Sequence, residues 1–104
     1  RVDRSALPIF EGARRLLNQG VRTGASGRNW TAVERHVQRP ADWTDADRDM
    51  LCDPQTSGGL LVAVSPDALN DAQRLLHEQK LPSAAVGSLT PSENGKPAIR
   101  LQTE

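Results

Sequence analysis

The stretch Leu51–Val64, LCDPQTSGGLLVAV, joins a polar, glycine-rich loop to a continuous apolar run. The run Leu60–Val64 is followed at once by Ser65-Pro66, a pair typical of the first residues of a helix. A short apolar run between turn residues is typical of a strand that is covered on both faces. We therefore predict a buried strand over Leu60–Val64 and a helix directly after it.

The chain beyond this strand predicts one more helix and two more strands. Pro66–Lys80 is expected to be a regular helix, because its apolar residues recur on one face. That apolar stripe comprises Leu69, Ala72, Leu75 and Leu76. Ala84–Leu89, AAVGSL, and Ala98–Leu101, AIRL, are predicted as strands, with hairpin turn chemistry at Asn94-Gly95 between them. A strand–helix–strand unit favours parallel strands with a right-handed crossover, to which the hairpin adds an antiparallel strand.

The first third of the chain predicts a helix followed by a loop. Pro8–Gln19 carries apolar residues at helical spacing, and Gly20 suits the left-handed position that ends a helix. Gly12 inside this helix would cost about 1 kcal/mol relative to alanine. Residues 20–31 contain three glycines and no apolar period, which predicts a loop. Trp30–Gln38 is rich in β-branched residues and predicts a short strand or an irregular segment.

A second short helix is predicted just before the quoted stretch. Thr44 and Asp47 have the spacing of a capping box, with aspartate in place of glutamate, so a helix is expected from there to about Leu51. Asp53-Pro54 ends it, because the residue before a proline avoids the helical region. The element order therefore predicts one α+β domain over residues 1–104, with helices packed against a mixed sheet.

The bulk properties suit a globular domain and give no preference for a charged partner. The chain has 104 residues, of which 37% are hydrophobic and 25% are charged, which argues against extensive disorder. Its 13 basic and 13 acidic residues cancel, so we expect no nucleic acid or membrane partner.

Cys52 is the single cysteine of the sequence, which agrees with a reducing compartment and predicts a small buried residue rather than a nucleophile. Because the first residue is Arg1 and not methionine, we expect the sequence to begin inside a longer chain.

Two polar segments are candidates for binding an anion. Thr56 and Ser57 supply hydroxyls, while Gly58 and Gly59 let backbone amides approach a phosphate without side-chain obstruction. The alternative is a purely structural entry into the strand, or a bulge, since the Gly-Lys-Ser/Thr ending of a nucleotide P-loop is missing. The second segment, TGASGRN, offers the guanidinium fork of Arg28 and the amide of Asn29, against the alternative of a solvated loop.

No metal site is predicted. His36 and His77 lie far apart in the sequence and have no neighbouring ligands at a suitable spacing. Four aspartates between residues 42 and 49 lack the glycine and the spacing of a calcium loop, and helix capping explains them better.

Four segments resemble the selenophosphate synthetases, also called selenide, water dikinases. Asp53–Leu61, DPQTSGGLL, is similar to a signature in the C-terminal half of that family. Residues 6–20, ALPIFEGARRLLNQG, resemble a family helix, and residues 21–29, VRTGASGRN, resemble a glycine-rich turn ending in Arg-Asn. AAVGSL resembles the strand after the last long helix. One departure is Arg22, which stands where the family commonly has proline.

The resemblance implies a fold and an activity for a larger parent protein. The family shares a superfamily with aminoimidazole ribonucleotide synthetase, so the chain would be a C-terminal domain of three-layer α/β/α type, without the N-terminal catalytic domain. The parent would make selenophosphate from selenide, ATP and water, releasing AMP and orthophosphate. ATP and magnesium would be held mainly by the other domain, with no cofactor bound tightly here. The parent is expected to be a cytoplasmic homodimer.

The resemblance also suggests roles for the candidate residues. No catalytic residue is expected in this chain; the loop with Thr56, Ser57, Gly58 and Gly59 would close the cleft over the phosphates, with Arg28 and Asn29 next to it. The remainder of the motif is expected to be structural and comprises Asp53, Pro54 and Gln55. Two alternatives stay open: another small-molecule kinase or synthetase of the same superfamily, and a non-catalytic binding module.

Overall fold

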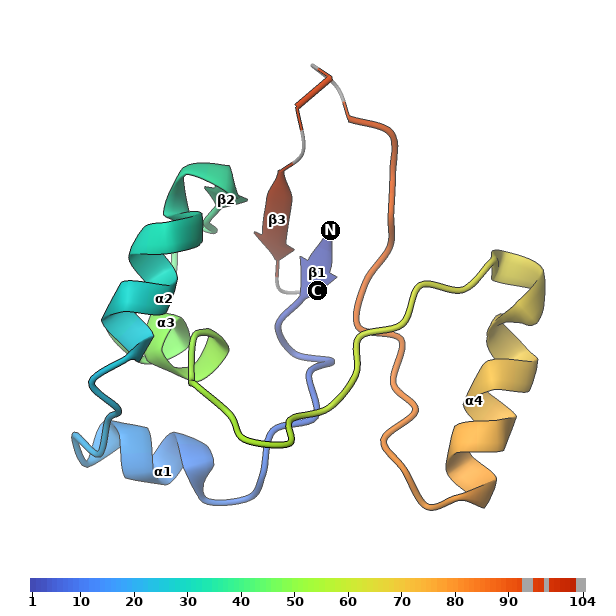
Figure 1. Cartoon of the computed structure of the whole chain (residues 1–104), viewed down its shortest axis with the longest axis horizontal. Helices are drawn as coiled ribbons and strands as arrows, with labels where there is room; N and C mark the ends of the chain where they lie inside the picture. Colours follow the sequence, from blue (N-terminus) through green and yellow to red (C-terminus); the bar gives the residue numbers. More distant parts are fainter. Residues whose placement is uncertain (93–94, 97, 103–104) are drawn as a thin grey trace.

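The computed structural model describes residues 1–92, 95–96 and 98–102. Three helices, α1 (Ala13–Asn18), α2 (Ser26–Val33) and α3 (Asp45–Leu51), lie together on one side of the molecule (Figure 1). Helix α3 packs against both of the others and so forms the centre of this group. Its beginning is the predicted capping box, in which Thr44 Oγ1 accepts a hydrogen bond from the Asp47 amide and Asp47 accepts one from the Thr44 amide.

A small sheet lies beside the helices. Its central strand, β3 (Ile99–Gln102), pairs in parallel with β1 (Val2–Asp3) on one edge and with β2 (Val37–Gln38) on the other. An antiparallel bridge from Val2 to Gly87 brings the Ala84–Leu89 segment to the outer edge of β1. The predictions of an α+β fold and a last strand are confirmed. The predicted mixed sheet is wrong, because all three strands of this sheet are parallel. The predicted strand over Ala84–Leu89 is also wrong, because the segment forms only the isolated bridge at Gly87. Leu101 in β3 is the buried hydrophobic residue of the described chain, at 7% exposure.

The predicted hairpin between the last two strands is wrong. β3 lies between β1 and β2, whereas the Ala84–Leu89 segment pairs with β1. The neighbouring strands β1 and β3 come from opposite ends of the chain, a pairing that a local turn signal could not reveal. The Asn94 half of the expected turn lies outside the described residues.

The predicted strand over Leu60–Val64 is also wrong in this structure. These residues follow an extended path between α3 and the following helical segment but pair with no strand (Figure 1). Leu60 is 92% exposed and Leu61 is 82% exposed. A strand buried on both faces needs neighbouring strands for its backbone and side chains above and below it. The described part of the chain supplies neither, so the expected crossover unit lacks its first strand.

The helix after this run is confirmed. A turn of 3-10 helix, η2 (Pro66–Ala68), leads into α4 (Leu69–Glu78), and Lys80 has a left-handed φ of 55° just beyond its end. The Gln73 amide donates to the carbonyl of Ser83 at 2.9 Å, which ties the helix to the chain that returns toward the sheet. Its apolar stripe is only partly covered, because Leu75 and Leu76 are exposed.

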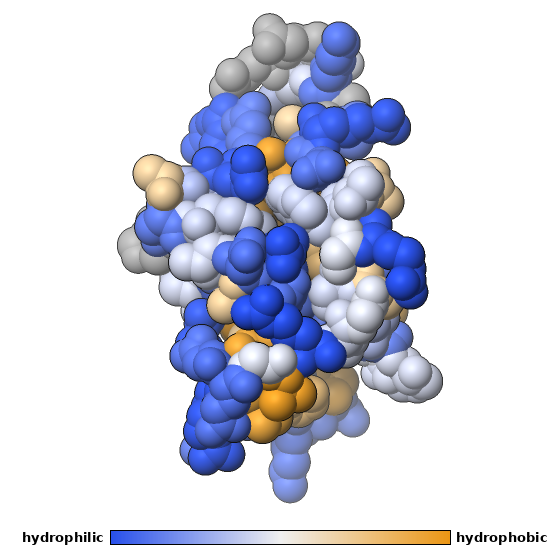
Figure 2. Space-filling view, turned by 90° about the vertical axis from the view of Figure 1, so that its left-hand side faces the viewer, coloured by the Kyte–Doolittle hydropathy of each residue, from blue (hydrophilic) through white to orange (hydrophobic). Residues whose placement is uncertain are grey.

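The N-terminal helix is shorter than predicted. Gly12, with a left-handed φ of 85°, stands before α1 rather than inside it, so its expected cost to a helix interior does not arise. The end of α1 is as predicted, with Gly20 in the left-handed region and its amide bonded to the carbonyl of Leu17. Phe10 and Leu16 remain exposed, and hydrophobic surface gathers over the lower part of the face where α1 lies (Figure 2).

The predicted loop over residues 20–31 is half wrong, because α2 begins at Ser26. Ser26 is buried, at 2% exposure, and its hydroxyl shares a hydrogen bond of 2.9 Å with that of Thr23. Contact with α3 thus stabilises a helix whose serine, glycine and asparagine favour loops when taken alone. The segment expected to be a strand or irregular is divided between the end of α2, the 3-10 turn η1 (Glu34–His36) and β2. No described helix is long and apolar enough to cross a lipid bilayer.

Candidate functional site

The motif loop, defined as Asp53–Gly59, runs from the end of α3 toward the exposed apolar run. All seven residues are exposed to solvent. Ser57 has a left-handed φ of 57°, one ingredient of the concave amide arrangements that bind anions. Gln55 folds back over Gly58, where an added Cβ would lie 2.7 Å from Gln55 Oε1, while Gly59 has open space around it.

Asn29 lies at the base of this loop. Its side-chain amide donates to the carbonyl oxygen of Cys52 at 2.9 Å, and that carbonyl belongs to the peptide group that joins Cys52 to Asp53. The carbonyls in the last turn of a helix have no partner within the helix, so Asn29 satisfies one of them from α2. The structure therefore brings the two sequence candidates, Asn29 and the motif loop, together.

Arg28 does not join them in this way. Its guanidinium donates to the carbonyl of Gly24 at 3.2 Å, within its own segment. The neighbouring Trp30 stacks at a tilt on Trp43, with ring centroids 5.4 Å apart, and the Arg39 guanidinium lies 5.6 Å from the Trp30 ring centroid. These contacts hold the far side of α2 against the chain that precedes α3.

A second tie between α2 and α3 is an ion pair around Asp49. Asp49 is 5% exposed, and its two carboxylate oxygens are approached by arginines from different segments. The Arg48 guanidinium lies 2.9 Å from Oδ1, and Arg22 Nε, from the turn before α2, lies 3.3 Å from Oδ2. A buried carboxylate is costly unless it is paired, so these arginines offset its loss of hydration. The prediction that Asp49 belongs to a helix-capping cluster is wrong, because residue spacing does not distinguish a buried carboxylate from an exposed one.

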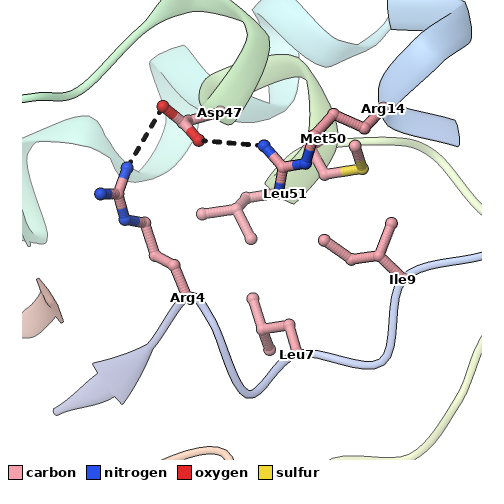
Figure 3. Close-up of a pocket in the computed structure, with 7 residues that line it drawn as sticks. All are labelled: Arg4, Leu7, Ile9, Arg14, Asp47, Met50 and Leu51. Carbon is pink, nitrogen blue, oxygen red and sulfur yellow. Dashed lines mark ion pairs between the residues drawn. The ribbon is translucent and has the colours of Figure 1, made fainter. Parts of the chain in front are cut away.

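A small pocket lies on the other side of α3. Figure 3 shows Arg4 and Arg14 converging on the carboxylate of Asp47, at 3.2 Å and 4.0 Å, above the apolar side chains of Leu7, Ile9, Met50 and Leu51. Its volume of about 10 Å³ suits one water molecule and excludes a nucleotide. This pocket is therefore a structural junction between α3, β1 and α1. No sequence pattern indicates a role for Arg4, because its partners lie about forty residues away.

The pKa shifts of Asp47 and Cys52 have causes in the packing around α3, which indicates structural roles for both side chains. Partial burial acts to raise the pKa of Asp47, but the hydrogen bonds from Thr44 and the charges of Arg4 and Arg14 outweigh it and lower the pKa. Burial raises the pKa of the Cys52 thiol, so the thiol stays protonated near neutral pH. Cys52 is half-buried at the end of α3, which agrees with the predicted structural role.

Among the described residues, no group of three or more His, Cys, Asp or Glu side chains is arranged to hold a metal ion. The exposed hydroxyls and amides of the motif loop are suited to an anion instead. The loop has the chemistry to contact a phosphate that is presented by another part of a protein, but it forms no enclosed pocket of its own.

The chain has clear sequence relatives, although no protein-family model matches it. It is 42% identical over 86 residues to the selenide, water dikinase of Pseudomonas straminea, and 41% identical over 90 residues to that of Burkholderia pseudomallei. It is 34% identical over 103 residues, or 98% of its length, to that of Escherichia coli. These matches cover 24%, 25% and 28% of the three relatives, so the chain spans about a quarter of the length of the proteins it matches. Over that quarter of their length, the chain is 34–42% identical to these selenide, water dikinases.

Proposed function

We propose that this chain is the C-terminal part of an enzyme that makes selenophosphate from selenide, ATP and water, releasing AMP and orthophosphate. The observation that carries the proposal is the 34–42% identity to three selenide, water dikinases over at least 83% of the chain. The parent would act in the cytoplasm as a homodimer, with ATP and Mg²⁺ held mainly by its other domain. The lone Cys52 agrees with a reducing compartment.

The exposed apolar surface supports the view that more of the parent covers this chain. Leu60, Leu61 and Val62 are consecutive and exposed, and α4 leaves Leu75 and Leu76 uncovered. Contiguous exposed apolar residues mark surfaces that another segment or partner covers. In the parent, Leu60–Val64 would gain neighbouring strands and complete the expected three-layer α/β/α domain.

The motif loop would take part in closing the cleft over the phosphates of ATP. Its support is chemical: the hydroxyls of Thr56 and Ser57, the bare backbone at Gly58 and Gly59, and the left-handed turn at Ser57 are all open to solvent. A phosphate held by the other domain could accept hydrogen bonds from these groups. The loop would bind the phosphates and exclude water from the cleft. The groups that react would belong to the rest of the enzyme.

The test is selenide-dependent conversion of ATP to AMP and orthophosphate by the full-length protein, with this 104-residue chain as the control. We expect turnover by the full-length protein and none by the chain alone. A full-length protein that binds ATP but shows no selenide-dependent turnover would refute the selenium chemistry. Turnover of ATP with another small molecule would instead identify a different kinase or synthetase.

A further inference from the structure

Asn29 occupies a position that explains how the motif loop is held. The loop is exposed over all seven residues and contains two glycines, so its own packing restricts it little. The peptide group between Cys52 and Asp53, where the loop starts, is held by the 2.9 Å hydrogen bond from the Asn29 amide to the Cys52 carbonyl. The Cys52 amide is fixed as well, because it donates to the carbonyl of Arg48 at 2.9 Å.

A second contact, the ion pair between Arg22 and Asp49, lies near this hydrogen bond. Asp49 lies in α3, and Cys52 is the residue that caps the C-terminus of that helix. Arg22 reaches Asp49 from the turn before α2, and Asn29 reaches Cys52 from within α2. The turn therefore contacts α3 through an ion pair, and α2 contacts the C-cap of α3 through a hydrogen bond.

We infer that Asn29 is a positioning residue, which fixes the first peptide group of the motif loop to α2 and so sets where the loop meets phosphate. The inference rests on the proposed function for the role of the loop. It differs from the sequence hypothesis, in which the Asn29 side chain faced the phosphates itself. In the structure, one of the two N–H donors of the Asn29 amide is taken by the Cys52 carbonyl.

The test compares Asn29→Ala and Asn29→Asp with the unsubstituted full-length enzyme. Alanine removes the donor, and aspartate places a carboxylate oxygen against the carbonyl oxygen. Asn70→Asp is the matched control, because Asn70 is exposed in the first turn of α4 and undergoes the same chemical change. Asn29→Ser, which keeps a shorter donor, serves if the other two variants do not fold. Each variant is followed by hydrogen exchange over the last turn of α3 and the motif loop, and by kcat and KM for ATP.

We expect exchange at the Cys52 amide and its neighbours to become about two- to tenfold faster in the Asn29 variants, the range given by loss of one hydrogen bond. KM for ATP should rise by a similar factor with a smaller change in kcat, and Asn70→Asp should change neither. A higher KM without faster exchange would overturn the inference and indicate direct contact between Asn29 and the ligand. Faster exchange with unchanged kinetics would support the anchor but overturn its effect on phosphate binding. Absence of turnover in the unsubstituted enzyme would refute the proposed function alone, since the exchange readout does not depend on it.

Discussion

Gly87 lies close against the backbone at the start of the chain, and this contact gives a quantitative prediction. A Cβ built on Gly87 would overlap the carbonyl oxygen of Arg1, which is a backbone atom and cannot rotate away. Gly87→Ala therefore forces the Ala84–Leu89 segment away from β1. Two hydrogen bonds are lost with it, from the Asp3 amide to the Val86 carbonyl at 2.9 Å and from the Ser88 amide to the Arg1 carbonyl at 3.0 Å.

Each of these bonds contributes about 0.5–1.5 kcal/mol, so their loss should lower the free energy of unfolding by about 1–3 kcal/mol. The assay is urea unfolding of the full-length protein, with Gly24→Ala as the control. Gly24 has no neighbour within 4 Å of an added Cβ, and its φ is not left-handed. The comparison cancels the effect of replacing glycine on the unfolded chain, which stabilises by about 0.4–1 kcal/mol. Unfolding energies that agree within about 0.5 kcal/mol would refute the close approach, because that is the range of neutral surface substitutions.

Three further predictions concern α3, the motif loop and the apolar run. The lowered pKa of Asp47 means that its carboxylate stabilises the fold above its unfolded pKa, about 3.9, and that this stability is lost as pH falls through the folded value. In urea unfolding, Asp47→Asn should therefore lower the free energy of unfolding by about 1 kcal/mol near pH 7 and by progressively less below about pH 4. A loss of unfolding free energy that grows in acid would contradict this reasoning. Gly59→Ala should leave the thermal midpoint of unfolding unchanged, because an added Cβ meets nothing within 4 Å. It should raise KM for ATP if the backbone of Gly59 faces phosphate, and an unchanged KM would contradict that role. Amides of residues 60–64 should exchange slowly in the full-length protein, as in a paired strand, and fast exchange there would mean that the run stays uncovered.

The elements that sequence analysis predicted well are those whose signals are local. The capping box at Thr44 and Asp47, the serine and proline before α4, and the glycine after α1 all act within one turn of the chain. Their energies do not depend on what lies elsewhere in the protein. The position of each of these helix ends could therefore be predicted from a few neighbouring residues.

The elements that were predicted wrongly depend on distant partners. Helix α2 forms against α3 from residues that favour loops, and β3 pairs with strands about sixty and one hundred residues earlier. Leu60–Val64 has the composition of a buried strand, but composition cannot supply the strands that would pair with it. The candidate site shows the same division. The motif loop was recognised from its residues, whereas the Asn29 anchor depends on where α2 packs.

Arg22 shows how a departure in sequence is accommodated by the fold. The resemblance led us to expect proline at this place in the turn, and a proline would fix φ at about −65°. Arginine lacks that restriction, but its Nε lies 3.3 Å from the buried carboxylate of Asp49, so the turn is tied to α3 through a side chain. Replacing Arg22 would therefore leave the buried Asp49 carboxylate with Arg48 as its remaining ion-pair partner, and the turn before α2 would lose this contact with α3.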